Sequence, residues 1–197
     1  MDEKQKRHFT WKYYKKKREE EVYQQSLFQK NDRVMVEFKD NFLSKKEHKR
    51  LCKLMNGRGF PWYYAENITF DKKKDGTNLF YMTHHFYEKD RPLSDLFDDY
   101  IMQFYDKLKV KAFIRVKGNL YPSQRKRTEH LKHWDYYYSH KAAIYCINTC
   151  DGYTLFDNGL KVDSVANRII TFDGSEDHAS TDCTNTKSRI NINFNYF

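Results

Sequence analysis

The chain has 197 residues, 39% hydrophobic content and a net charge of +9, which suits one domain with a buried core and a basic surface. Its four cysteines form no CxxC pair, which argues against a cysteine zinc finger and fits a reducing compartment. No apolar run reaches membrane-spanning length. We therefore expect a cytoplasmic protein without a membrane partner. The basic charge makes a nucleic-acid partner conceivable, although no nucleic-acid-binding motif favours one.

The first elements follow from local pattern. Residues 1–30 are highly charged and weakly patterned, which predicts a basic tail or a loosely packed helix. A strand is predicted over 33–38, followed by a helix over 44–56. Ser44 with Glu47 three residues later forms a capping box for that helix. Two extended segments then flank a turn at 71–76.

A second helix is predicted over 92–108, because apolar residues recur there at steps of three and four. From about 109 to 197 the pattern changes to short apolar or alternating runs separated by turn residues. Together with 16 Tyr and 15 Phe, which favour strands, this predicts a mainly β, α+β fold with flanking helices. One domain is expected over 31–197.

A histidine and an aspartate, His133 and Asp135, stand two apart in a segment that reads as a strand. Residues at i and i+2 of a strand point to the same face. A histidine and a carboxylate on one face supply two of the three ligands of a facial triad, which binds Fe(II) and leaves positions open. Candidates for the third ligand are His140 and His178. His140 follows closely, at the start of the next run, where we expect it to face a loop, whereas His178 can return on a later strand to face the first pair.

Arg189 follows His178 and begins an alternating strand. One face carries an arginine and three asparagines, and the other face is apolar. A polar face inside a small β domain is costly unless it lines a cavity. An arginine in such a cavity offers a planar fork that matches a carboxylate.

In this order, the H-x-D pair, the distal histidine and the arginine resemble the Fe(II)/2-oxoglutarate-dependent dioxygenases. The prolyl 4-hydroxylase-like branch, with its phage and marine-virus members, is the most similar. The segments "VEFKDNFLSKKEHKRL", "NLYP", "AIYCIN", "GYTLF" and "VANRIITFDGSEDHAST" resemble, in order, motifs of that branch. The resemblance covers about 33–197. It implies a double-stranded β-helix, the jelly-roll or cupin-like core, and for a viral member it would mean the host cytoplasm.

The resemblance also implies the chemistry. Fe(II) would be held by His133, Asp135 and His178, and 2-oxoglutarate would place its far carboxylate on Arg189. With O2 as second cosubstrate and ascorbate as a reductant, the expected reaction is hydroxylation of a C–H bond, on a protein side chain such as proline, with release of succinate and CO2. Halogenating relatives carry a small residue at the position of Asp135, so a carboxylate there favours hydroxylation.

Further site residues are expected from the same resemblance. Tyr121 and Asn191 are predicted to contact 2-oxoglutarate, and Tyr136 and Tyr145 to form part of the substrate wall. The position of a family tyrosine that binds the far carboxylate is Cys146 here, so another group must replace that tyrosine.

Two other functions remain open. Demethylation of alkylated nucleic-acid bases would suit the charge of +9. However, those demethylases carry a second arginine six residues after the first, where this chain has Asn195. A binding module that kept the fold and lost catalysis is the second alternative, and the intact ligand set argues against it.

Overall fold

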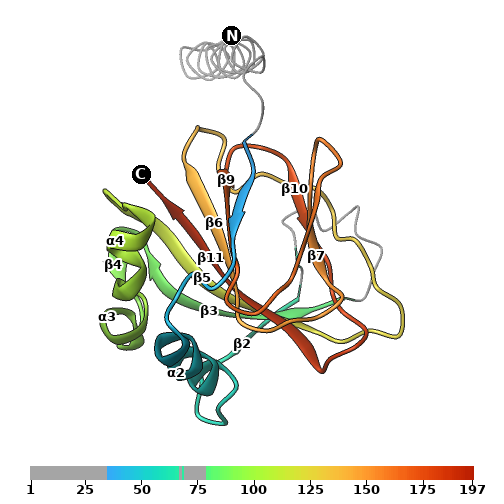
Figure 1. The fold of residues 1–197 in the computed structure, drawn as a ribbon, viewed down its shortest axis with the longest axis horizontal. Helices are drawn as coiled ribbons and strands as arrows, with labels where there is room; N and C mark the ends of the chain where they lie inside the picture. The colour runs from blue at the N-terminus through green and yellow to red at the C-terminus, as the bar shows by residue number, and fades with distance from the viewer. Residues whose placement is uncertain (1–34, 67, 69–78) are drawn as a thin grey trace, which may run out of the picture. The chain divides into compact units, whose positions relative to one another are not determined.

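The computed structural model describes residues 35–66, 68 and 79–197. The predicted tail over 1–30 and the predicted turn over 71–76 lie outside the described residues. Two antiparallel sheets and a few short helices make up the described part (Figure 1). None of its helices combines the length and the apolarity that crossing a bilayer requires.

The large sheet is built around a long C-terminal strand. Its order is β1-β9-β6-β11-β5-β3-β2, and β4 pairs with β3 at one end. The strands of this sheet are β1 (Glu37–Lys39), β2 (Tyr63–Ala65), β3 (Tyr81–Glu88), β4 (Arg91–Pro92), β5 (Phe113–Pro122), β6 (Lys141–Cys146), β9 (Ile169–Asp173) and β11 (Ser188–Tyr196).

The small sheet has the order β10-β7-β8, formed by β7 (Tyr153–Phe156), β8 (Lys161–Asp163) and β10 (His178–Ser180). Isolated bridges join the free edge of β10 to the segment before β6, at Glu129 with Thr181 and at His133 with His178. Two antiparallel sheets closed in this way form the predicted jelly-roll core, so the expected fold class is confirmed.

Alternation along the central strands separates two interiors. On β6, Ala143 and Tyr145 belong to a core shared with the helices, whereas Ile144 and Cys146 belong to a second core beside the small sheet. On β11, Ile190, Ile192 and Phe194 join the helix-side core. The opposite face of β11 therefore points between the two sheets, as its sequence pattern predicted. This polar face consists of Arg189, Asn191, Asn193 and Asn195, all buried.

The helices cover one face of the large sheet (Figure 1). α2 (Lys45–Met55) starts at the predicted capping box, in which Ser44 and Glu47 each bond the other's backbone N–H. Leu51 and Met55 of α2 are buried in the helix-side core. The predicted helix of residues 44–56 is thus confirmed to within a residue at each end.

The predicted continuous helix over 92–108 is wrong. The segment forms α3 (Leu96–Tyr100), the 3-10 turn η1 (Met102–Phe104) and α4 (Tyr105–Leu108). Pro92 lies in β4, because this strand pairs with the end of β3. The periodic apolar residues from Leu96 to Leu108 still join the helix-side core, whereas Leu93 is exposed. The periodicity therefore predicted most of the burial correctly and the continuity of the helix incorrectly.

Candidate metal centre

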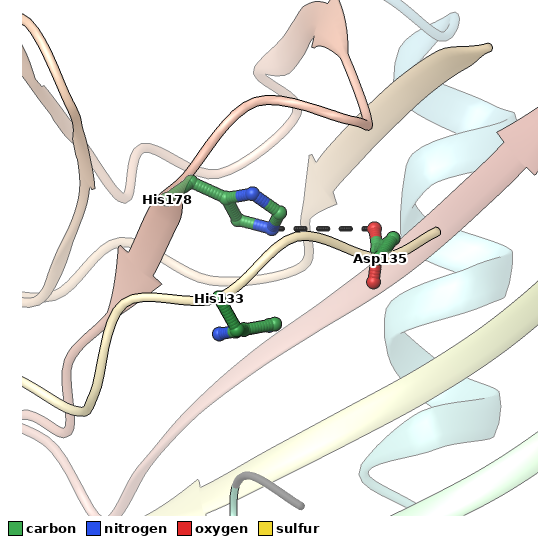
Figure 2. Close-up of side chains that lie close together, drawn as sticks. All are labelled: His133, Asp135 and His178. Carbon is green, nitrogen blue, oxygen red and sulfur yellow. Dashed lines mark ion pairs between the residues drawn. The ribbon is translucent and has the colours of Figure 1, made fainter. Parts of the chain in front are cut away.

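Three side chains from two parts of the chain converge beside the small sheet. His133 and Asp135 come from one segment, and His178 is the first residue of β10 (Figure 2). One ligand atom from each of the three lies within 4.8 Å of the others. The Nε2 atom of His178 is 4.0 Å from Oδ2 of Asp135. The structure therefore brings the three predicted ligands together, and their binding of a metal remains a prediction.

Backbone pairing brings the trio together. The amide of His133 donates to the carbonyl of His178 at 2.9 Å, and the reverse bond measures 3.0 Å. A regular antiparallel ladder would then place Asp135 opposite Glu176. Instead, the amide of Asp135 bonds the carbonyl of Gly174 at 3.0 Å, so two extra residues bulge out of the partner segment. The predicted strand through His133 and Asp135 is therefore wrong, although the two side chains still reach one site.

Both histidines are oriented by the same local contact. Nδ1 of His133 lies 3.2 Å from the carbonyl of Leu131, and Nδ1 of His178 lies 2.9 Å from the carbonyl of Glu176. If Nδ1 carries the proton in each bond, Nε2 keeps its lone pair for a metal. Burial, together with the neighbouring His178, lowers the pKa of His133 to about 4. The imidazole of His133 is therefore neutral at pH 7 and ready to bind a cation.

Asp135 is held on both oxygens. Arg115 donates to Oδ1 at 2.5 Å, and Asn193 donates to Oδ2 at 3.1 Å. Burial alone would raise the pKa of Asp135, but Arg115 and the two histidines outweigh it and hold that pKa well below its usual range. Two imidazoles and one ionised carboxylate are the donor set that suits Fe(II) with positions left open.

At the other end of the same cavity lies a buried guanidinium. Arg189 is 0% exposed; its Nη1 donates to the carbonyl of Thr181 and its Nη2 to Oγ1 of Thr154, both at 3.0 Å. Its Nε has no hydrogen-bond partner, and no carboxylate of the described residues forms an ion pair with it. A buried cation without a counter-charge is costly. The residues at this end therefore fit a carboxylate supplied by a ligand such as 2-oxoglutarate.

The remaining predicted cosubstrate residues also line this cavity. Tyr121 stands opposite Arg189 in the β5–β11 register, with its ring centre 5.9 Å from the guanidinium carbon. Asn191 accepts a hydrogen bond from Nδ2 of Asn119 at 2.9 Å, which leaves Oδ1 of Asn119 without a partner in the described structure. Contact of Tyr121 and Asn191 with a cosubstrate remains a prediction.

Neither predicted substrate-wall tyrosine lines the cavity. Tyr145 faces the helix side, where its hydroxyl lies 2.6 Å from Nδ1 of His48 and donates to Asn167 at 2.9 Å. The prediction for Tyr145 is wrong because Cys146, one residue on, occupies the face towards the small sheet. Tyr136 lies outside the cavity lining, with its ring under the guanidinium of Arg115 at 5.3 Å.

The cavity contains residues that the sequence reasoning missed. β5 points one side chain in two inward, and its inward face carries Arg115, Lys117 and Asn119 before Tyr121. The signal was the same alternation of polar and apolar residues that marked β11. The lining residues of the cavity are Ile68, Tyr81, Lys117, Asn119, Tyr121, His133, Asp135, Ile144, Thr154, His178, Ser180, Arg189, Asn191 and Asn193.

A glycine next to the guanidinium was also missed. A Cβ added at Gly152 would lie 2.7 Å from Cδ of Arg189 and 2.7 Å from the carbonyl oxygen of Asp182. Real Cβ atoms do not come this close to other heavy atoms. The stem of Arg189 therefore needs a residue without a side chain at this position of the "GYTLF" segment.

Comparison with known proteins gives a consistent fold. No protein-family model and no curated protein sequence matches the chain. Among solved structures, a Pseudomonas putida prolyl-4-hydroxylase aligns with a TM-score of 0.57 at 13% identity, over 83% of this chain and 92% of that chain. A 2OG-Fe(II) oxygenase family oxidoreductase from Burkholderia pseudomallei gives 0.58 at 10%, over 82% and 84%.

A third structure is a Trichoplax adhaerens prolyl hydroxylase in complex with a peptide fragment of the hypoxia inducible factor oxygen degradation domain. It aligns with a TM-score of 0.55 at 16% identity, over 95% of this chain and 93% of that chain. At these identities the likeness establishes the fold. The chain has the fold shared by prolyl hydroxylases and 2OG-Fe(II) oxygenases.

Proposed function

We propose that the protein is an Fe(II)- and 2-oxoglutarate-dependent oxygenase that hydroxylates a C–H bond, on a protein side chain such as proline, and releases succinate and CO2. The observation that carries the proposal is one cavity with two matched ends. One end holds the His133, Asp135 and His178 cluster, and the other end holds the buried, uncompensated Arg189. A metal chelator with a distal carboxylate fits both ends at once.

The spacing along β11 supports this division. Asn193 bonds Asp135 at the metal end, and Arg189 lies four residues away on the same face. At roughly 3.3 Å per residue, the two backbone positions are about 13 Å apart. The guanidinium side chain reaches back from its end of this span towards the metal ligands, so one small diacid can fill the space between them.

The residues of the cavity have distinct tasks in this reaction. Fe(II) bound by the trio, with 2-oxoglutarate and O2, supplies the oxidising chemistry. Nε2 of His133 and Nε2 of His178 would donate their lone pairs to the metal, and Asp135 would contribute negative charge. Arg115 fixes the orientation of that carboxylate through its bond to Oδ1. The buried walls exclude water from the reacting centre.

Two observations support a hydroxylated protein side chain as the product. Asp135 fills the ligand position that a halogenating enzyme would leave to chloride. The Trichoplax adhaerens structure with the same fold contains a peptide. A proline side chain in a peptide is therefore the first substrate class to test.

Base demethylation is less well supported. Asn195 takes the position of the second arginine of the demethylases, and it is buried in contact with Nε2 of His140 at 2.7 Å and Oδ1 of Asn193 at 2.7 Å. Asn195 is uncharged, so this position lacks the cation that the second arginine of the demethylases would supply. Succinate release stimulated by methylated single-stranded DNA, and not by peptides, would favour demethylation.

The direct test measures succinate from 2-oxoglutarate with purified protein, Fe(II) and ascorbate. The wild type should turn over 2-oxoglutarate slowly alone and faster with a substrate. His178→Ala should lose turnover by at least about 100-fold, since a ligand is missing. His85→Gln is the matched control, because this partly exposed histidine pairs with Glu88 outside the cavity lining. Equal turnover by His178→Ala and wild type would refute the proposal.

A further inference from the structure

One cation of the cavity has no task in the reaction described above. Lys117 lies on the inward face of β5 and lines the cavity together with the metal ligands. In the β5–β11 register it stands opposite Asn193, which bonds Asp135. Lys117 is therefore level with the metal cluster. Arg189 is four residues away from this level along β11.

The ammonium of Lys117 makes fewer hydrogen bonds than it has donors. Its one hydrogen bond in the described structure goes to the hydroxyl of Tyr81 at 3.4 Å, although an ammonium has three donors. None of the described carboxylates forms an ion pair with it, because Asp135 is already paired with Arg115. Burial first, and then Arg115, lowers the pKa of Lys117 to about 8, while Asp135 and Glu88 oppose that change. The group is thus a cation at pH 7.

The charges of the cavity do not balance without a further anion. Lys117 and Arg189 both line the cavity, whereas the one carboxylate of its lining, Asp135, is already paired with Arg115. Fe(II) brings two positive charges and 2-oxoglutarate brings two negative ones, so these two leave the excess unchanged. Two positive charges remain in a water-poor space, where such an excess attracts an anionic ligand.

The two ends of the cavity offer cations for two different ligands. Arg189 is placed for the far carboxylate of the cosubstrate, and the backbone position of Lys117 is about 13 Å away from that of Arg189 along the sheet. We propose that Lys117 determines substrate specificity by binding a carboxylate of the primary substrate next to the C–H bond that is oxidised. This inference rests on the proposed function and names the class of its substrate: a molecule or peptide with a carboxylate beside the target carbon.

The test compares acids with their amides. The probes are L-proline with L-prolinamide, and proline peptides with aspartate or asparagine beside the proline. Binding is measured by calorimetry on protein loaded with Mn(II) and N-oxalylglycine, which cannot turn over, and kcat/KM is measured by succinate release. A charge-assisted hydrogen bond predicts that the acid of at least one pair is favoured by roughly tenfold to a hundredfold.

Three variants separate the role of Lys117 from a structural one. Lys117→Met should reduce the acid-over-amide ratio to below about twofold, with the KM for 2-oxoglutarate unchanged, and Lys117→Arg should keep most of the ratio. Lys141→Met is the matched control, because Lys141 is exposed at the start of β6. It should behave as wild type.

Equal binding of acid and amide in both pairs, including no binding of either, would overturn the inference. So would a higher KM for 2-oxoglutarate in Lys117→Met with the acid preference intact, since Lys117 would then serve the cosubstrate. Acid-selective binding that Lys117→Met abolishes, without succinate release from any probe, would refute the proposed function and leave only the carboxylate-binding role of Lys117.

Discussion

Replacing Arg189 with methionine removes the buried cation and keeps an unbranched stem of similar length. In the structure the guanidinium has two neutral acceptors, Thr181 and Thr154, and an unused Nε. A bound carboxylate would add charge-assisted hydrogen bonds worth about 1.5–3 kcal/mol each. Loss of two such bonds costs at least about 3 kcal/mol, which weakens 2-oxoglutarate binding by about 100-fold.

Thermal unfolding with Mn(II) in place of Fe(II) measures this effect without turnover. At a 2-oxoglutarate concentration of 100 times its Kd, the wild type gains about 2.7 kcal/mol. For a domain of this size that corresponds to a rise in Tm of about 5–10 °C. At the same concentration Arg189→Met should gain only about 0.4 kcal/mol, or about 1 °C.

The same variant tests the cost of the unpaired cation. Without 2-oxoglutarate, Arg189→Met should unfold within about 1 kcal/mol of wild type, because the lost hydrogen bonds are offset by removal of a buried charge. Arg168→Met is the control, since Arg168 pairs with Asp40 at 2.6 Å outside the cavity lining. A full ligand-induced rise in Arg189→Met, or its loss in Arg168→Met, would refute the reasoning.

Three further substitutions test separate parts of the site. Arg115→Met frees Oδ1 of Asp135, so Fe(II) affinity should fall about 10- to 100-fold in a metal titration; unchanged affinity would show that the ion pair does not orient the ligand. Gly152→Ala pushes against Cδ of Arg189, so the KM for 2-oxoglutarate should rise about tenfold with Fe(II) binding intact; an unaltered KM would mean that the arginine adapts. Tyr145→Phe should lower the free energy of unfolding by about 1–2 kcal/mol in urea and leave that KM unchanged, whereas a raised KM would return this residue to the cavity.

The β11 strand shows what periodicity predicts well. Its alternating sequence predicted Arg189 and Asn193 on one face of the strand and Ile192 on the other, and the structure has them there. A two-residue period is a direct consequence of strand geometry, so it needs no knowledge of the partner strands. The same two-residue period in β5 places Lys117 on the face that lines the cavity. In β6 it places Tyr145 and Cys146 on opposite faces, so only one of these two residues can face the small sheet.

Other features depended on tertiary context. The bulge that brings the amide of Asp135 to the carbonyl of Gly174 lies in the loop between β9 and β10. No local pattern encodes that offset, so the H-x-D segment read as a strand. The segment 92–108 keeps its helical spacing of apolar residues, yet Pro92 pairs with β3 as part of β4, and the helical part divides into α3, η1 and α4. Local sequence patterns do not predict such pairings between distant segments.

The central claim is that His133, Asp135 and His178 bind one ferrous ion and that the bound ion, together with Arg189, binds 2-oxoglutarate. The most direct measurement is an anaerobic titration of the Fe(II)-loaded protein with 2-oxoglutarate, followed by visible absorbance. The account predicts a metal-to-ligand charge-transfer band that saturates at one equivalent per chain and is missing in His178→Ala. Iron-loaded wild type without such a band, or the variant with the same band, would contradict it.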